Sequence, residues 1–198
     1  MKSLLRNSGL TLLELLIALI LTGIVALSIF SLDIFGHYHI IGLDKRRRVQ
    51  NQVSDVLEHM SKNIINAVGN TAISGMSPVN ITDGPTVEVY LDKPGESETS
   101  GDGRYGTGGD IWVAYRYNSS GYEMRYCSDY GTGDCNADWS VIGKNISEFS
   151  PTYTPPDNFI TVNITGCWNS SEASTCGSPN NPAVNMTTRF NMLSVAQN

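Results

Sequence analysis

A single carboxylate lies inside the most apolar stretch of the sequence. Glu14 is the first acidic residue of the chain, and nearly all of residues 10–35 are apolar. On insertion scales, a carboxylate near the bilayer centre costs about 2.5–3.5 kcal/mol and less near the edge, so such a residue usually serves a functional charge pair. The simpler alternative is a side chain that reaches the nearby water interface without a partner. Glu14 is therefore a candidate for binding a cationic group.

The element that must position Glu14 is a long apolar helix. A helix rises about 1.5 Å per residue, so roughly 20 residues cross a hydrocarbon core of about 30 Å, and we expect residues 15–32 to be long enough. Lys2 and Arg6 precede the run, which predicts a cytoplasmic N-terminus and an exported remainder. No small-x-small cleavage site follows the apolar run. Two alternatives remain, an uncleaved anchor or a leader that is cut before the run.

The stretch Gly9-Leu10-Thr11-Leu12-Leu13-Glu14-Leu15 resembles the processing site of type IV prepilins. The resemblance implies that a prepilin peptidase cuts between Gly9 and Leu10 and methylates the new amine of Leu10. It also implies that Glu14 pairs with the N-terminal amine of a neighbouring subunit, which sets the axial register of a filament. Leu10 departs from the usual phenylalanine, although the family accepts other apolar residues at this position.

Beyond the membrane segment, apolar residues continue at steps of three and four, which predicts one helix over residues 10–68 with Gly69 as its stop. These residues would form an apolar stripe along one side of the helix. The polar part of the chain must cover this stripe, so we expect the stripe to form part of the core of the head. The predicted stripe consists of Val49, Val53, Val56, Leu57, Met60, Ile64 and Val68.

The strongest basic cluster is Lys45, Arg46, Arg47 and Arg48. It could bind phosphate groups of lipid or DNA. The favoured interpretation is a solvated helix face paired with Asp44 or with acids on neighbouring subunits, because the cluster lies on the exported side.

The sequence of the polar head predicts β-structure. Several segments alternate apolar and polar residues or concentrate β-branched and aromatic types. Together with the helix they predict an α+β fold, in which the long helix packs on an antiparallel sheet, as in pilins. Residues 95–110 are rich in glycine and charge and predict a flexible surface loop. The predicted strands are residues 86–91, 111–117, 122–127, 159–166 and 184–193.

Four cysteines lie in the head, namely Cys127, Cys135, Cys167 and Cys176. Their spacings of eight and nine residues do not suit metal ligands of the C-x-x-C type, so disulfides in an oxidising compartment are favoured. Four cysteines allow three connectivities. Pairing of sequence neighbours, Cys127 with Cys135 and Cys167 with Cys176, is the favoured one.

Catalytic chemistry finds little support in the sequence. The three histidines, His37, His39 and His59, all fall on the predicted helix, so the head lacks the base of a Ser-His or Cys-His pair. Asp129, Asp134 and Asp138 could suggest a calcium loop, but their spacing misses the EF-hand pattern and a solvated disulfide loop explains these acids equally well. We expect no enzyme activity, no metal and no cofactor.

The charge of the head separates possible partners. From residue 70 onward there are 14 acidic and 6 basic side chains, a formal net charge of −8. Such a surface repels phosphate backbones, so direct nucleic-acid binding is not expected. The expected partners are other pilin or pseudopilin subunits, the prepilin peptidase and the inner membrane.

These observations predict a leader at residues 1–9, a transmembrane or filament-core helix at 10–36, an amphipathic helix at 37–69 and an extracytoplasmic β-rich head at 70–198. The resemblance implies a single-pass protein of the bacterial inner membrane that enters a type IV pilus or a type II secretion pseudopilus. Ser31 occupies a position at which major pilins commonly have proline. The long helix and the head resemble those of minor pilins and J-type minor pseudopilins that prime assembly. The alternative is a membrane-anchored binding module that keeps its N-terminal anchor.

Overall fold

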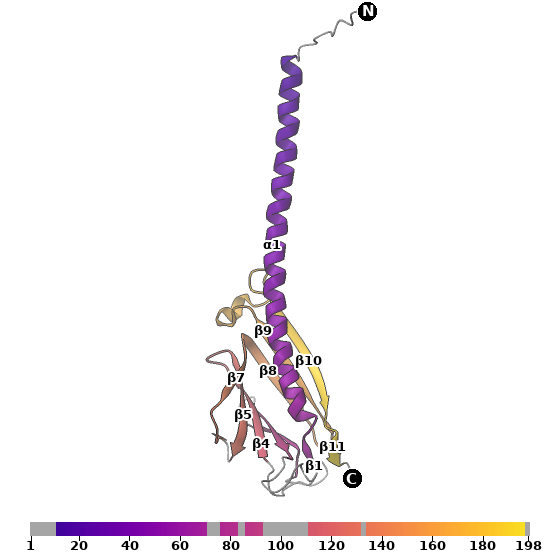
Figure 1. Cartoon of the computed structure of the whole chain (residues 1–198), viewed down its shortest axis with the longest axis vertical. Helices are drawn as coiled ribbons and strands as arrows, with labels where there is room; N and C mark the ends of the chain where they lie inside the picture. Colours follow the sequence, from indigo (N-terminus) through magenta and orange to yellow (C-terminus); the bar gives the residue numbers. More distant parts are fainter. Residues whose placement is uncertain (1–10, 71–75, 83–85, 93–110, 132–133, 197–198) are drawn as a thin grey trace, which may run out of the picture. The chain divides into compact units, whose positions relative to one another are not determined.

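The computed structural model describes residues 11–70, 76–82, 86–92, 111–131 and 134–196 (Figure 1). The chain divides into two compact units, Met1–Leu43 and Asp44–Asn198. Helix α1 (Leu12–Ile64) contributes to both units. In the first unit the described residues belong to α1 and its cap, whereas the second unit combines the rest of α1 with all the strands of the described residues.

The amphipathic part of α1 confirms the predicted stripe. Its buried side chains are Val49, Val53, Val56, Leu57, Met60 and Ile64, spaced at three and four residues. The helix ends at Ile64, five residues before the predicted stop, and Leu10 lies outside the described residues. Val68 is buried, but as part of strand β1 (Val68–Asn70).

Gly69 does not terminate the helix, so that prediction was wrong. It lies in β1, where an added Cβ would come within 2.5 Å of the carbonyl oxygen of Met76. The glycine is needed because the backbone of residues 76–78 passes close to this strand.

One sheet of the head has six strands in the order β2-β3-β4-β5-β6, with β7 also paired to β5. Its pairings are antiparallel. Strand β3 is buried along its whole length. Val87, Val89 and Leu91 belong to the core cluster that includes the buried residues of α1, and on the other face Tyr90 packs against Trp112. The strands are β2 (Val79–Thr82), β3 (Thr86–Leu91), β4 (Ile111–Asn118), β5 (Glu123–Gly131), β6 (Asp134–Cys135) and β7 (Ser140–Lys144).

A second antiparallel sheet has the order β10-β9-β8, and the short strands β1 and β11 form a parallel pair. The part of α1 from Asp44 onward runs along this sheet (Figure 1). A 3₁₀ segment, η1 (Ser170–Thr175), follows β9. The strands are β8 (Ile146–Tyr153), β9 (Phe159–Cys167), β10 (Ala183–Asn191) and β11 (Ser194–Ala196).

The core lies between α1 and the inner faces of both sheets. Two glycines allow this close approach. A Cβ at Gly143 in β7 would collide with Cγ2 of Val56, and one at Gly166 in β9 would come within 2.7 Å of Cγ2 of Val53. The helix therefore rests directly on strand backbone at these two points.

The structure confirms the predicted α+β class, a long helix packed on antiparallel sheets. Each predicted strand segment contains a strand, although β10 ends at Asn191 rather than at residue 193. Six of the described strands were not predicted, namely β1, β2, β6, β7, β8 and β11. Pro151 obscures β8 in the sequence, yet proline is tolerated there because β8 is an edge strand of its sheet. The predicted loop at 95–110 lies outside the described residues.

Candidate assembly site at the N-terminal end of the helix

Thr11 and Glu14 form a capping box at the start of α1. The backbone N–H and the hydroxyl of Thr11 both donate to Oε2 of Glu14 at 2.9 Å, and the N–H of Glu14 donates to Oγ1 of Thr11 at 3.3 Å. The carbonyl of Thr11 accepts the first helical bond, from Leu15. Reciprocal bonds of this kind satisfy amide groups that the first helical turn leaves open.

The arrangement leaves one oxygen of the Glu14 carboxylate available. Both bonds from Thr11 end on Oε2, whereas Oε1 has no hydrogen-bond partner among the described residues. The side chain is exposed. Glu14 can therefore keep its cap and accept a further donor, such as an ammonium group, on Oε1. The sequence pattern Thr-x-x-Glu is typical of a capping box. From the sequence we predicted only a charge pair for Glu14 and missed this cap.

Side chains of the apolar part of α1 find no cover in the first unit. Large apolar residues from Leu12 to Leu43 are exposed, with Leu12 at 82% and Leu32 at 71%. Within the described residues one helix, α1, is long and apolar enough to cross a membrane, with a mean hydropathy of 2.7 over its most apolar window.

The threonine and serine hydroxyls of this segment are satisfied inside the helix. Thr22 donates to the carbonyl of Ala18 at 2.7 Å, and Ser28 donates to that of Ile24 at 2.9 Å. Ser31 makes the same bond to Leu27. Because the helix supplies these acceptors, the hydroxyls add little cost in lipid.

Gly9 and Leu10, the predicted cleavage and methylation residues, lie outside the described residues. Their roles stay predictions, as does the assembly role of Glu14. Thr11 and Glu14, which follow these two residues in the sequence, lie at the N-terminal end of α1.

The head contains disulfides Cys127–Cys135 and Cys167–Cys176, which is the pairing of sequence neighbours favoured above. The first joins β5 to β6, and the second closes the loop that carries η1.

Asp129, Asp134 and Asp138 do not form a metal cluster. Asp134 accepts the N–H of Cys135 at 2.8 Å, and Asp129 accepts a bond from Asn136 at 3.4 Å. Within the part of the chain that the structure describes, no group of three or more His, Cys, Asp or Glu residues could hold a metal ion.

Among the three histidines, His59 contacts the strands of the described structure, where its ring packs against Tyr115 and Tyr126. The ring of His39 contacts Phe35 on the same helix. Its Nδ1 lies 3.0 Å from the hydroxyl of Tyr115, which donates to the carbonyl of His59 and accepts a bond from Asn63 at 2.6 Å. Partial burial, and then the charge of Lys62, lowers the pKa of His59. Burial raises the pKa of Tyr115. This cluster joins α1 to β4 and has the character of a structural contact.

Two residues of the basic cluster, Arg48 and Lys45, bind other groups of the chain. Arg48 forms a salt bridge of 3.0 Å with Asp44, the pairing expected above. Lys45 donates to the carbonyl of Asn180 at 3.1 Å and lies 5.7 Å from the centre of the Trp168 ring. Arg46 and Arg47 are exposed.

A single long helix packed on antiparallel sheets defines a pilin-like α+β fold. Residues 4–30 match the family described as Prokaryotic N-terminal methylation motif, the prepilin signal of type IV pilins and pseudopilins. The match includes Gly9, Leu10 and Glu14 and confirms the resemblance seen in the sequence. No curated protein matches the chain. The chain thus carries the signal of a pilin- or pseudopilin-like subunit, and its apolar helix fits a single-pass anchor in the inner membrane.

Proposed function

We propose that the chain is a minor pilin or minor pseudopilin that takes part in the assembly or priming of a type IV pilus or a type II secretion pseudopilus. The observation that carries the proposal is the coincidence of the methylation motif with a capped, uncovered apolar helix. A structural role in a filament, rather than catalysis, accounts for these features.

In this proposal the peptidase removes residues 1–9 and methylates the amine of Leu10. The segment 10–36 then serves first as the membrane anchor and later as part of the filament core. Residues 37–69 link this segment to the head, residues 70–198, which lies in the periplasm or at the cell exterior. The compact units of the structure divide at Leu43, within the linking segment.

Glu14 is the proposed assembly contact. Its Oε2 remains bound to Thr11, and its Oε1 receives the N-terminal amine of a neighbouring subunit. Two opposite charges attract far more strongly in the low dielectric of lipid or a filament core than in water, so the pair favours one axial register. The cap orients the carboxylate before the neighbour arrives, which reduces the entropy lost on pairing.

Cross-linking in native membranes tests the proposed partners. A photoreactive amino acid at Ile24, whose side chain is 56% exposed, should give adducts with other processed pilin-type subunits. Gly9→Val should abolish these adducts, because the retained leader prevents assembly. Adducts with lipid alone, or the same protein adducts in the Gly9→Val chain, would support an uncleaved monomeric anchor instead.

A further inference from the structure

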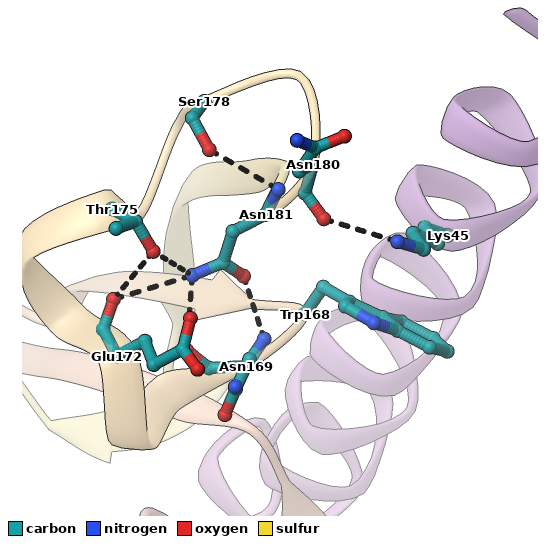
Figure 2. A pocket seen from close by; sticks show the side chains of 8 residues that line it. All are labelled: Lys45, Trp168, Asn169, Glu172, Thr175, Ser178, Asn180 and Asn181. Atoms are coloured by element: carbon teal, nitrogen blue, oxygen red, sulfur yellow. Dashed lines mark hydrogen bonds between the residues drawn. The ribbon is translucent and has the colours of Figure 1, made fainter. Parts of the chain in front are cut away.

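A pocket of about 390 Å³ lies in the second unit, where α1 meets the loop that follows β9 (Figure 2). Its volume falls in the range of sites for small ligands, about 300–1,000 Å³. Residues far apart in the sequence build it, since Lys45 and Asn180 are separated by 135 positions. The lining consists of Lys45, Trp168, Asn169, Glu172, Thr175, Ser178, Asn180 and Asn181.

The wall of the pocket is fixed from behind by Asn181, which is only 4% exposed. Its side-chain amide donates to the carbonyls of Asn169 at 3.0 Å and Glu172 at 3.3 Å, and to the hydroxyl of Thr175 at 2.9 Å (Figure 2). Its Oδ1 accepts the N–H of Asn169 at 2.7 Å. The Cys167–Cys176 disulfide closes the same loop. The pocket is therefore formed before any ligand binds, which lowers the entropic cost of binding.

Several polar groups of the lining remain available. The carboxylate of Glu172 and the side-chain amide of Asn180 are exposed and have no hydrogen-bond partner among the described residues. Lys45 uses one of its three N–H groups on the carbonyl of Asn180. Trp168 packs one part of its ring against the core and stays partly exposed. The pocket thus offers an aromatic surface flanked by donors and acceptors of both kinds.

This combination disfavours apolar and anionic ligands. An acyl chain or another apolar ligand would need more apolar lining than the single ring of Trp168. A phosphate or other anion is disfavoured because the charge of Glu172 offsets that of Lys45 within one pocket. A neutral ligand with many hydroxyl groups fits, since each hydroxyl can donate to a carboxylate and accept from an amide, while its C–H surface packs on an aromatic ring.

We propose that this pocket binds a neutral saccharide of one to three units, through Trp168, Glu172 and Asn180. Saccharide binding goes beyond filament assembly, and the pocket lies in the second unit of the chain rather than at the N-terminal end of α1. Failure of saccharide binding would leave the proposed assembly role untouched.

Saturation-transfer NMR on the full chain tests the proposal, in a detergent without a sugar head group so that the detergent cannot compete. The probes are cellobiose, lactose and diacetylchitobiose, with inorganic phosphate and free glycine as charged comparisons. At least one disaccharide should receive saturation at its ring protons. Glu172→Gln and Asn180→Ala, both at exposed positions, should each weaken binding about tenfold or abolish it, because each removes a group that hydrogen-bonds the ligand.

Two further variants separate recognition from folding. Trp168→Ala should abolish the transfer. Trp139→Phe, at a partly exposed tryptophan that packs against the separate cluster of Ala114, Cys127 and Tyr130, should leave it unchanged. The proposal is overturned if none of the three disaccharides receives saturation. It is also overturned if Glu172→Gln and Asn180→Ala bind like the wild type, or if glycine or phosphate binds in place of the sugars.

Discussion

At the scale of single residues, the observed role of Glu14 and its proposed role can be separated by mutation. Glu14 caps its own helix through Oε2, and in the proposed function its Oε1 receives the amine of a neighbouring subunit. Glutamine at this position preserves the cap, since a capping box accepts Gln as well as Glu, but it removes the charge. Thr11→Val weakens the cap and keeps the charge, because it removes the two bonds of the hydroxyl but leaves the backbone N–H bond and the carboxylate.

We expect Glu14→Ala and Glu14→Gln to be cleaved after Gly9 and inserted normally, yet to enter filaments poorly. The reason is that only the charged carboxylate can attract the amine of a neighbour. Thr11→Val should assemble better than either. Immunoblots of sheared filaments and membranes measure both steps. If the Glu14 variants assemble as well as the wild type, Glu14 is not an assembly contact, and a place at the filament tip becomes the better interpretation.

His59 should make the stability of the head depend on pH. Its pKa is lowered in the folded chain by burial and by Lys62, so the unfolded chain, with an ordinary value near 6.5, binds the proton more readily. Stability is therefore fully present above the unfolded pKa and falls as the pH drops through it. The other groups facing the ring, Tyr115 and Tyr126, remain neutral in this range.

Urea unfolding of the full chain in detergent at pH 7.5 and pH 5 measures the effect. His59→Gln should lose less stability than the wild type between the two pH values, whereas His39→Gln, on the first unit, should match the wild type. An equal pH dependence in the wild type and in His59→Gln would show that His59 contributes nothing to it.

At the scale of elements, the contact between α1 and β7 depends on Gly143. An added methyl group there would meet Cγ2 of Val56, while the next nearest atom, Cβ of Met124, lies at an ordinary 3.8 Å. Gly143→Ala should therefore destabilise the head by about 1–3 kcal/mol, the usual cost of overpacking.

The clash predicts a coupling between the two residues. Val56→Ala alone should be destabilising because it leaves a cavity, but in the double variant the new methyl group of residue 143 takes that space. The double variant should be more stable than the sum of the single effects by about 1 kcal/mol or more. Denaturant midpoints of the four chains give the coupling, and simple additivity would mean that α1 does not rest on β7 as described.

The elements differ in how far the sequence predicts them. The stripe on α1 follows from its period of three to four residues, and strands such as β3 and β9 follow from alternation or β-branched residues. The C-terminal end of α1 and strand β8 could not be predicted from the sequence. Tertiary contacts at Gly69 override the local signal in the first case, and the edge position of Pro151 does so in the second. The pocket could not be predicted either, since it joins Lys45 to a loop 135 positions away.

At the scale of the whole molecule, one account links the N-terminal motif, the uncovered apolar helix and the disulfide-bonded acidic head. In the proposed function the first directs processing, the second supplies the anchor and filament segment, and the third faces an oxidising compartment. The alternative, a monomeric anchored protein, shares the helix and the head. The two differ at a single peptide bond, that between Gly9 and Leu10.

Mass spectrometry of the N-terminal peptide tests this central claim most directly. The chain is isolated from native membranes of a strain with active prepilin peptidase, alongside a Gly9→Val chain as the control. The account predicts a mature chain that begins with N-methylated Leu10, and a Gly9→Val chain that keeps its leader. A wild-type chain with an intact leader from Met1 would contradict it.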